Sequence, residues 1–293
     1  MSRPGRAPAF RFQWRDLFAL LCGAFLGVWL LVIAYPLLFV VSYSLRRTDE
    51  LSLDRFAGLV PVHIRWANYP DAFDLMSTSL ISIPRIVLNS AIVTVGAIVI
   101  ALVASILAAY AFSTIPFAGR RLIFYMLLMA LIVPIPVMLI PEFLTVKEYG
   151  LIGTRLSLIL PYAAFGLPLP ILVLTTFFRE IPAEIMEAAT LDGAGRLRTL
   201  CSVILPLSRP AIATCVIFLT LMFWNEFPLA LVMVQDSSLT TVPLAIAGVQ
   251  SRGAAAWELI AAAIMIMSIP VVALFVAFQR QFIEGLAQGS VKG

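Results

Sequence analysis

The chain has 293 residues, of which 61% are hydrophobic and only 12% are charged, and its mean hydropathy is +1.01. A soluble domain carries about 25% charged residues to cover its surface, so this composition excludes a water-soluble globular protein and indicates a chain solvated largely by lipid. The formal net charge is +4, but no basic patch alternates with aromatic side chains as a nucleic-acid site would. We therefore expect an all-α membrane protein that contacts the lipid bilayer and no nucleic acid.

The N-terminus predicts a membrane span that is retained in the protein. Residues 1–16 form a basic tail with four arginines, and the apolar run 17–45 follows directly. This run is too long for the core of a signal peptide, and no small-residue cleavage site comes after it. Gly23 and Gly27 form a GxxxG pattern, which we interpret as a helix-packing feature.

Six apolar runs reach the length of about 20 residues that a helix needs to cross a bilayer. They are residues 17–45, 84–112, 121–144, 156–178, 210–234 and 257–280. Proline kinks or interrupts helices within a membrane, so we expect bent helices that line a path where prolines fall in the third and fourth runs. These prolines are Pro134, Pro136, Pro141, Pro168 and Pro170. The runs together predict a single transmembrane domain over residues 1–293.

The distribution of Lys and Arg predicts that both termini are cytoplasmic. In this orientation the inner segments hold twelve basic residues and the outer segments hold eight. Arg46 and Arg47 follow the first span and oppose this orientation, but the four arginines before the span favour it more strongly. Residues 179–209, here named the charged segment, then face the cytoplasm. The outer segment 46–83 is the longest connection, and its mixed charge and aromatic residues predict a small folded cap.

Few residues could carry out chemistry or bind a metal. The only histidine, His63, has no ligand partner nearby in the sequence, and we expect it in a loop. Cys22, Cys201 and Cys215 form no CxxC pair, so the sequence predicts neither a disulfide framework nor a metal site. The spans contain no paired carboxylates, which argues against a membrane-embedded enzyme.

The charged segment lies between two of the most apolar runs and is interrupted by glycines. Pro182 suits the first turn of a helix, and residues 183–192 favour a helix that Gly193 would end. Residues 196–205 can form a second short helix. These patterns predict two short helices hinged at a glycine on the cytoplasmic surface, which either dock on a partner protein or lie there as a solvated hairpin.

The charged segment also resembles the EAA loop of bacterial ABC importer permeases. The resemblance is carried by Glu187-Ala188-Ala189, three residues, Gly193, nine residues and Val203-Ile204-Leu205-Pro206. Val203 stands where the pattern usually has Ile. In that family the loop forms coupling helices that dock into a groove of the cytoplasmic ATPase subunit. The resemblance implies this role for Glu187, Ala188, Ala189, Asp192, Gly193, Ala194, Leu205 and Pro206.

Motifs along most of the chain are similar to the carbohydrate-uptake branch of this family, in particular to the second, shorter membrane subunit of the maltose transporter. They are WANYPDAF (66–73), LNS (88–90), AAYAFS with GRR (108–121), GLIGT (150–154), WNEF (224–227) and QGSVKG (288–293). The resemblance implies a type I ABC importer permease fold with six transmembrane helices, in the bacterial cytoplasmic (inner) membrane. It also implies a second homologous permease subunit, an ATP-binding subunit dimer and an extracytoplasmic substrate-binding protein.

The chain contains no phosphate-binding loop of its own. A Walker A loop needs a Gly-Lys pair, whereas Lys147 and Lys292, the only lysines, both follow valine. We therefore expect no enzymatic activity and no cofactor bound by this chain. ATP and Mg²⁺ would be bound by the partner ATPase.

Trp224, Asn225 and Glu226 lie near the middle of the run 210–234 and are the candidate residues of a substrate path. A carboxylate at that depth is costly, so Glu226 should face the bundle interior or a water-filled cavity. It could bond a sugar hydroxyl, bond across the permease interface, or hold a break in its own helix before Pro228. Trp224 offers an aromatic face for a sugar. The resemblance implies that most substrate contacts come from the partner permease.

The resemblance thus implies a permease subunit of an ATP-driven importer for a carbohydrate, which couples motion of the ATPase subunits to alternating access. Two alternatives stay open. A permease for a glycerophosphate-like solute would suit the outer-facing arginines. An ion-coupled secondary transporter would need titratable groups along its path, and only Glu226 lies deep in a span.

Overall fold

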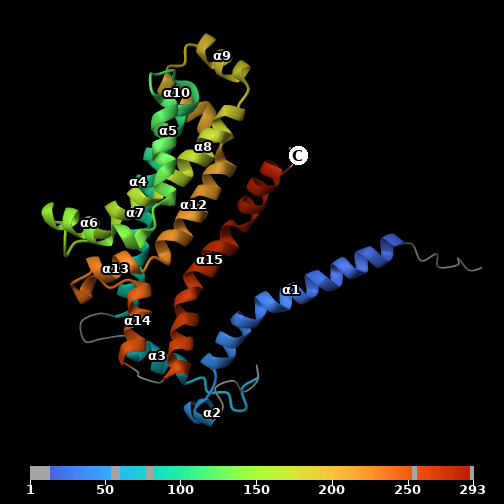
Figure 1. The fold of residues 1–293 in the computed structure, drawn as a ribbon, viewed down its shortest axis with the longest axis vertical. Helices are drawn as coiled ribbons and strands as arrows, with labels where there is room; N and C mark the ends of the chain where they lie inside the picture. Colours follow the sequence, from blue (N-terminus) through green and yellow to red (C-terminus); the bar gives the residue numbers. More distant parts are fainter. Residues whose placement is uncertain (1–13, 54–59, 77–81, 253–255, 291–293) are drawn as a thin grey trace, which may run out of the picture.

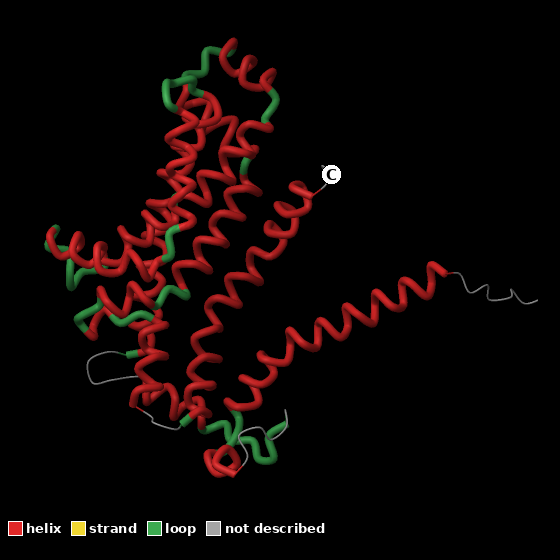
Figure 2. The backbone as a smooth tube through the Cα atoms, in the orientation of Figure 1, coloured by secondary structure: helices red, strands yellow, loops and turns green. Residues whose placement is uncertain are grey.

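The computed structural model describes residues 14–53, 60–76, 82–252 and 256–290. Every regular element in these ranges is a helix (Figure 2), so the all-α prediction is confirmed. Most of the basic N-terminal tail and the last three residues of the QGSVKG motif lie outside the described ranges.

The bundle brings together helices from distant parts of the chain (Figure 1). They include α4 (Ile83–Thr114), α8 (Pro168–Glu180), α12 (Arg209–Trp224) and α15 (Trp257–Ser290). Helix α4 packs against α8 and α12, and α12 packs in turn against α15. Ala97, Ala101 and Ser105 of α4 are completely buried, and such small residues let neighbouring helices approach closely within a membrane.

Two of the described helices are by themselves long and apolar enough to cross a membrane, α1 (Trp14–Ser44) and α4. The number rises to five when each pair of consecutive bent helices is taken as one span. The bends are 106° between α5 (Arg120–Met129) with η1 (Ala130–Ile132) and α6 (Ile135–Glu148), 42° between α7 (Leu156–Gly166) and α8, and 79° at the start of α12.

The runs 121–144 and 210–234, each expected to form one span, are both interrupted. Pro134 follows Val133, whose backbone is extended, because a residue before proline is disfavoured in the helical region. Helix α6 then leaves the direction of α5. Helix α12 ends at Trp224, and a short helix, α13 (Pro228–Met233), follows. The two diverted segments, α6 and α13, pack against each other at one side of the bundle (Figure 1).

The two ends of the bundle carry different short helices (Figure 1). Helices α9 (Ala183–Leu191) and α10 (Arg196–Thr199) of the charged segment lie at one end. Helices α2 (Thr48–Leu53), α3 (Asn68–Met76) and α14 (Val242–Arg252) lie at the other. Helix α3 packs against α14 and α15, so the described part of the outer segment forms the expected folded cap. His63 lies outside any helix, as predicted, and its backbone N–H donates to Glu50.

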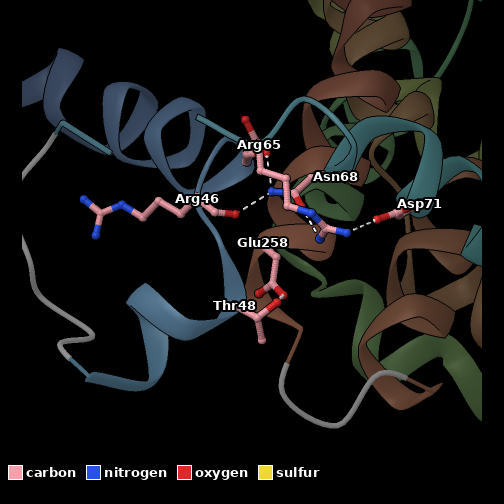
Figure 3. A network of polar contacts seen from close by, with 7 residues as sticks. Arg46, Thr48, Arg65, Asn68, Asp71 and Glu258 are labelled. Carbon is pink, nitrogen blue, oxygen red and sulfur yellow. Dashed lines mark hydrogen bonds and ion pairs between the residues drawn. The ribbon is translucent and has the colours of Figure 1, made fainter. Parts of the chain in front are cut away.

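A buried asparagine joins the end of α1 to the cap (Figure 3). The side-chain amide of Asn68 donates to the carbonyl oxygen of Ser44 at 3.0 Å and to that of Arg46 at 2.6 Å. Its own oxygen accepts from Arg65 at 2.9 Å, and Arg65 also pairs with Asp71 at 2.8 Å. Because Asn68 has no exposed surface, these bonds fix the point where α1 enters the cap.

A second link runs from Thr48 to Glu258 at the start of α15, where the hydroxyl donates to the carboxylate at 2.6 Å (Figure 3). Helix α1 also packs against α15. Beyond these contacts it projects away from the bundle (Figure 1), and no residue of its most apolar stretch is buried. A Cβ added at Gly23 or Gly27 would meet no atom within 4 Å. The GxxxG pattern therefore makes no packing contact with the part of the chain that the structure describes.

Candidate functional site

The first candidate site is the charged segment, whose first helix, α9 (Ala183–Leu191), ends in a Schellman turn. The amide of Gly193 donates to the carbonyl of Thr190 at 3.0 Å, and the amide of Ala194 donates to that of Ala189 at 2.9 Å. Gly193 has a φ of 75°, in the left-handed region that glycine adopts without a steric penalty. The predicted helix stop at Gly193 is confirmed.

The second half of the charged segment is a composite helix. It consists of α10 (Arg196–Thr199), a π turn (Leu200–Ile204) and α11 (Leu205–Leu207). Ser208 is completely buried where this helix meets α12 at an angle of 79°. The second short helix predicted over 196–205 is confirmed, and it lies across the end of α12 rather than along it.

The charged segment has an inner and an outer face. On the inner face, Met186, Leu200 and Ile204 join a core cluster with residues of α4, α8 and α12, and Ala189 is also buried. On the outer face lie five of the eight predicted coupling residues. The exposed ones are Glu187, Ala188, Asp192, Gly193 and Pro206, whereas Ala194 and Leu205 are half-buried.

Two leucines that sequence reasoning did not single out stand on either side of the glycine turn. The side chain of Leu191 is 89% exposed and that of Leu197 is 70% exposed. They belong to the polar end of the molecule, where water would surround them. The signal available in the sequence was an apolar residue on each side of Gly193. The two exposed leucines form an apolar surface of the kind that marks protein contacts, which a solvated hairpin would not need.

The second candidate site is the break between α12 and α13, and Glu226 holds it together. One carboxylate oxygen of Glu226 accepts from the backbone amide of Leu229 at 2.8 Å, and the other accepts from that of Ala230 at 3.2 Å. The hydroxyl of Tyr162 donates to the second oxygen at 2.6 Å. Glu226 is only 8% exposed. Of the three roles considered for this carboxylate, its contacts within the chain match the helix break.

The residues on either side of the break differ in exposure. Trp224 is buried, and it packs in a core cluster with Met76 and Met267. Its ring is therefore covered within this chain and offers no free face for a sugar. Asn225 is exposed, and its side-chain amide donates to the carbonyl of Leu221 at 2.8 Å. Of the three adjacent candidate residues, Trp224 and Glu226 thus lie in the protein interior and Asn225 lies on the surface of this chain.

Tyr162 and Gly166 of α7 were missed by sequence reasoning, although they complete the break. The ring of Tyr162 stacks on Phe223, with centroids 5.6 Å apart. A Cβ at Gly166 would lie 2.4 Å from Phe223 and 3.0 Å from Leu219, so only glycine permits this approach of α7 to α12. A tyrosine within an apolar run is a weak signal, because nothing local indicates a partner 64 residues away.

The two candidate sites lie at different levels of the molecule. Helix α12 has 16 residues, so its length separates them by about 24 Å at 1.5 Å per residue. The charged segment thus belongs to one end of the bundle and the helix break to its middle. Helix α12 is the direct structural connection between them.

Comparison with known proteins gives a consistent result along the chain. A family model described as "Binding-protein-dependent transport system inner membrane component" matches residues 9–287. The chain is 34% identical over 277 residues to the diacetylchitobiose uptake system permease protein NgcG of Streptomyces coelicolor, covering 94% of this chain and 89% of the relative. It is 35% identical over 272 residues to the trehalose transport system permease protein SugB of Mycobacterium tuberculosis, covering 90% and 95%.

Solved structures agree with the fold. A crystal structure of a bacterial ABC transporter involved in the import of the acidic polysaccharide alginate matches with a TM-score of 0.75 and 24% identity, over 94% of this chain and 99% of that one. A bacterial alginate ABC transporter in complex with an alginate pentasaccharide-bound periplasmic protein matches with a TM-score of 0.65 and 16% identity. The predicted ABC importer permease fold is confirmed.

Proposed function

This chain belongs to the family of binding-protein-dependent transport system inner membrane components, and we propose that it is the permease subunit of an ATP-driven importer for a carbohydrate. The similar proteins from Streptomyces and Mycobacterium are named for the uptake of diacetylchitobiose and of trehalose. They support a sugar as the cargo. The chain has no Gly-Lys pair for a phosphate-binding loop, so a partner subunit binds ATP and Mg²⁺ and hydrolyses the nucleotide.

The observation that carries this proposal is the outer face of the charged segment. It combines a hydrogen-bonded glycine turn with two highly exposed leucines at one end of the bundle. A partner's groove would bury both leucines, and each buried leucine stabilises a complex by about 1.5–3 kcal/mol. We assign this face, with Glu187, Ala188, Asp192 and Gly193, to contact with the ATPase subunit on the cytoplasmic side.

The other partners follow from the same proposal. Helix α1 leaves the bundle without a buried apolar face, which fits a second, homologous permease subunit beside it. The family description supports a separate extracytoplasmic binding protein that delivers the substrate. Both termini would then be cytoplasmic, with the cap of α2, α3 and α14 on the outer side.

The test compares two substitutions of nearly equal shape at the glycine turn. Both Gly193→Asn and Gly193→Asp introduce side chains that tolerate a positive φ, and a Cβ at Gly193 meets no atom within 4 Å. Only the aspartate adds a charge to the docking surface. The tagged chain is purified in detergent from cells that express the whole transporter, and co-purified ATPase subunit and ATP hydrolysis are measured.

We expect Gly193→Asn to retain the ATPase subunit and Gly193→Asp to lose most of it while staying inserted in the membrane. A Leu191→Asp variant should behave like Gly193→Asp, because it places a carboxylate at the most exposed leucine. A chain that purifies alone and still transports, or an ATPase subunit retained equally by all variants, would refute the proposal.

A further inference from the structure

Asn225 is a polar residue on an otherwise apolar exposed stripe of α12. Leu221 and Met222, one turn before it, are 40% and 37% exposed, and residues three and four apart share a helix face. Trp224 and Glu226 turn inward and are 9% and 8% exposed. The stripe thus carries one hydrogen-bonding side chain, at the end of the helix.

Hydrocarbon is a poor environment for this side chain. Asn225 lies about 24 Å along α12 from Arg209, a length that fits within a hydrocarbon core of about 30 Å. A carboxamide has two donor hydrogens and an acceptor oxygen, and among the described residues its hydrogen bond is the one to Leu221. Irregular backbone at such depth is tolerated where it lines a water-filled cavity or is covered by protein. The face of Asn225 therefore meets a path or a protein, and not lipid.

We propose that Asn225 is the residue through which this chain contacts the transported carbohydrate, and that Glu226 is its positioning residue. A carboxamide donates to one sugar hydroxyl and accepts from the neighbouring one, which a carboxylate or an apolar side chain does not do. This inference rests on the proposed function, because it takes the sugar as the cargo. It separates the roles of two adjacent residues that the sequence alone placed together.

Glu226 positions Asn225 by fixing the backbone between α12 and α13. Its carboxylate accepts from two backbone amides of α13 and from the Tyr162 hydroxyl. These bonds hold the chain direction at residues 225–227, where the helical ladder is absent, and they anchor it to α7. The aromatic stack of Tyr162 on Phe223 keeps the last turn of α12 in place. Asn225 is consequently presented at a fixed angle with little freedom to turn inward.

The test measures whether water and sugar reach position 225 in the assembled transporter. Cys22 and Cys201 are replaced by Ala, and Cys215 is kept as a buried reference on the same helix, since it is 1% exposed. Asn225→Cys is then compared with Met222→Cys, one turn away on the same face. The complex with its ATPase is reacted with a membrane-impermeant cationic methanethiosulfonate, without nucleotide and with ATP and vanadate, in the presence or absence of diacetylchitobiose, trehalose, maltose or raffinose.

We expect Asn225→Cys to react at least tenfold faster than Cys215 in one of the two nucleotide states. At least one saccharide should slow that reaction more than it slows Met222→Cys. Reaction no faster than that of Cys215 in both states would mean that the second permease or lipid covers position 225, and it would overturn the inference. So would labelling that no saccharide slows.

The uptake of the protecting saccharide then separates contact from positioning. Asn225→Leu should raise KM about tenfold with little change in maximal rate, since one lost hydrogen bond corresponds to roughly that factor. Glu226→Leu should lower the maximal rate as well, and Glu226→Gln, which keeps an acceptor oxygen, should recover part of the loss. A complex that assembles and hydrolyses ATP but shows an unchanged KM with Asn225→Leu contradicts this inference alone. Failure to assemble with the ATPase contradicts the proposed function instead.

Discussion

At the scale of single residues, the helix break depends on one hydrogen bond between distant parts of the chain. The Tyr162 hydroxyl and the Glu226 carboxylate meet at 2.6 Å, and both side chains are buried. Removing a hydroxyl from a buried pair leaves the partner short of a donor, and that deficit costs more than the bond contributes when it is made.

The first prediction concerns this pair. Tyr162→Phe should lower the free energy of unfolding by about 1–3 kcal/mol, because it leaves a buried carboxylate oxygen with one donor fewer. Thermal unfolding of the purified chain in detergent measures the change. Tyr125→Phe is the matched control, because Tyr125 is 61% exposed and its hydroxyl deletion should leave the midpoint in place. Equal midpoints for the two variants would contradict the assigned role of Tyr162.

The second prediction concerns Gly166. Gly166→Ala should destabilise the chain by about 1–3 kcal/mol through overpacking, since the new Cβ would lie 2.4 Å from Phe223. Gly27→Ala adds the same methyl group where no atom lies within 4 Å and should be neutral or slightly stabilising in the isolated chain. Unfolding midpoints of the two variants that agree within error would show that α7 and α12 are less tightly packed than the structure indicates.

Sequence reasoning reached part of this arrangement and missed the rest for a physical reason. A carboxylate inside an apolar run has to face inward or toward water, so Glu226 was recognisable without a structure. The donors to Glu226 were not recognisable, because neither a tyrosine in a distant apolar run nor two backbone amides have a signature in the local sequence. Trp224 was expected to offer an aromatic face, but the direction of a side chain depends on where the helix ends.

At the scale of elements, local chemistry was more predictable than helix direction. The stop at Gly193 was foreseen, because a Schellman turn involves only neighbouring residues. Pro134 and Pro136 indicated a kink, yet the 106° bend also depends on the packing of α6 on α13. The polar contacts that tie α1 to α3 join residues more than twenty positions apart and had no signature in the sequence.

The third prediction tests the anchor of α1. Asn68→Ala removes the donors to the carbonyl groups of Ser44 and Arg46, so the end of α1 should open locally. Hydrogen exchange of the amides in residues 40–46 should become at least tenfold faster, while exchange in α12 stays unchanged. Asp74→Ala, an exposed change on the same helix, serves as the control. Unchanged exchange at the end of α1 would mean that other contacts hold it.

At the scale of the whole molecule, helix α1 stands apart from the other long helices (Figure 1). Helix α1 is apolar around its circumference, with Leu20, Phe25 and Trp29 all more than half exposed. Such a helix is stable in lipid by itself, but its separation from the bundle leaves room for a neighbouring protein. The number of apolar runs was readable from the sequence, whereas the departure of α1 from the bundle was not.

The fourth prediction concerns the surroundings of α1. In a variant with Trp29 as its only tryptophan, lipids brominated in their acyl chains should quench the fluorescence strongly when the chain is reconstituted alone. Addition of the second permease should reduce that quenching by at least half, because protein replaces lipid around α1. A second tryptophan variant that reports from α6, such as Val137→Trp, controls for general changes in the bilayer. Quenching of Trp29 that is unaffected by assembly would leave α1 as a lipid-facing helix.

The projecting first helix also has a consequence for how a cell makes this protein. A copy synthesised without the proposed second permease holds α1 by the polar bonds to the cap and by the packing of α1 on α15. The remaining apolar length of α1 stays available to any other membrane helix it meets. Surplus copies would then be prone to mispairing and to removal by membrane proteases. With the proposed second permease as its partner, the cell would have to match the supply of the two chains, so we expect the amount of this chain that accumulates to be set by the scarcer of the pair.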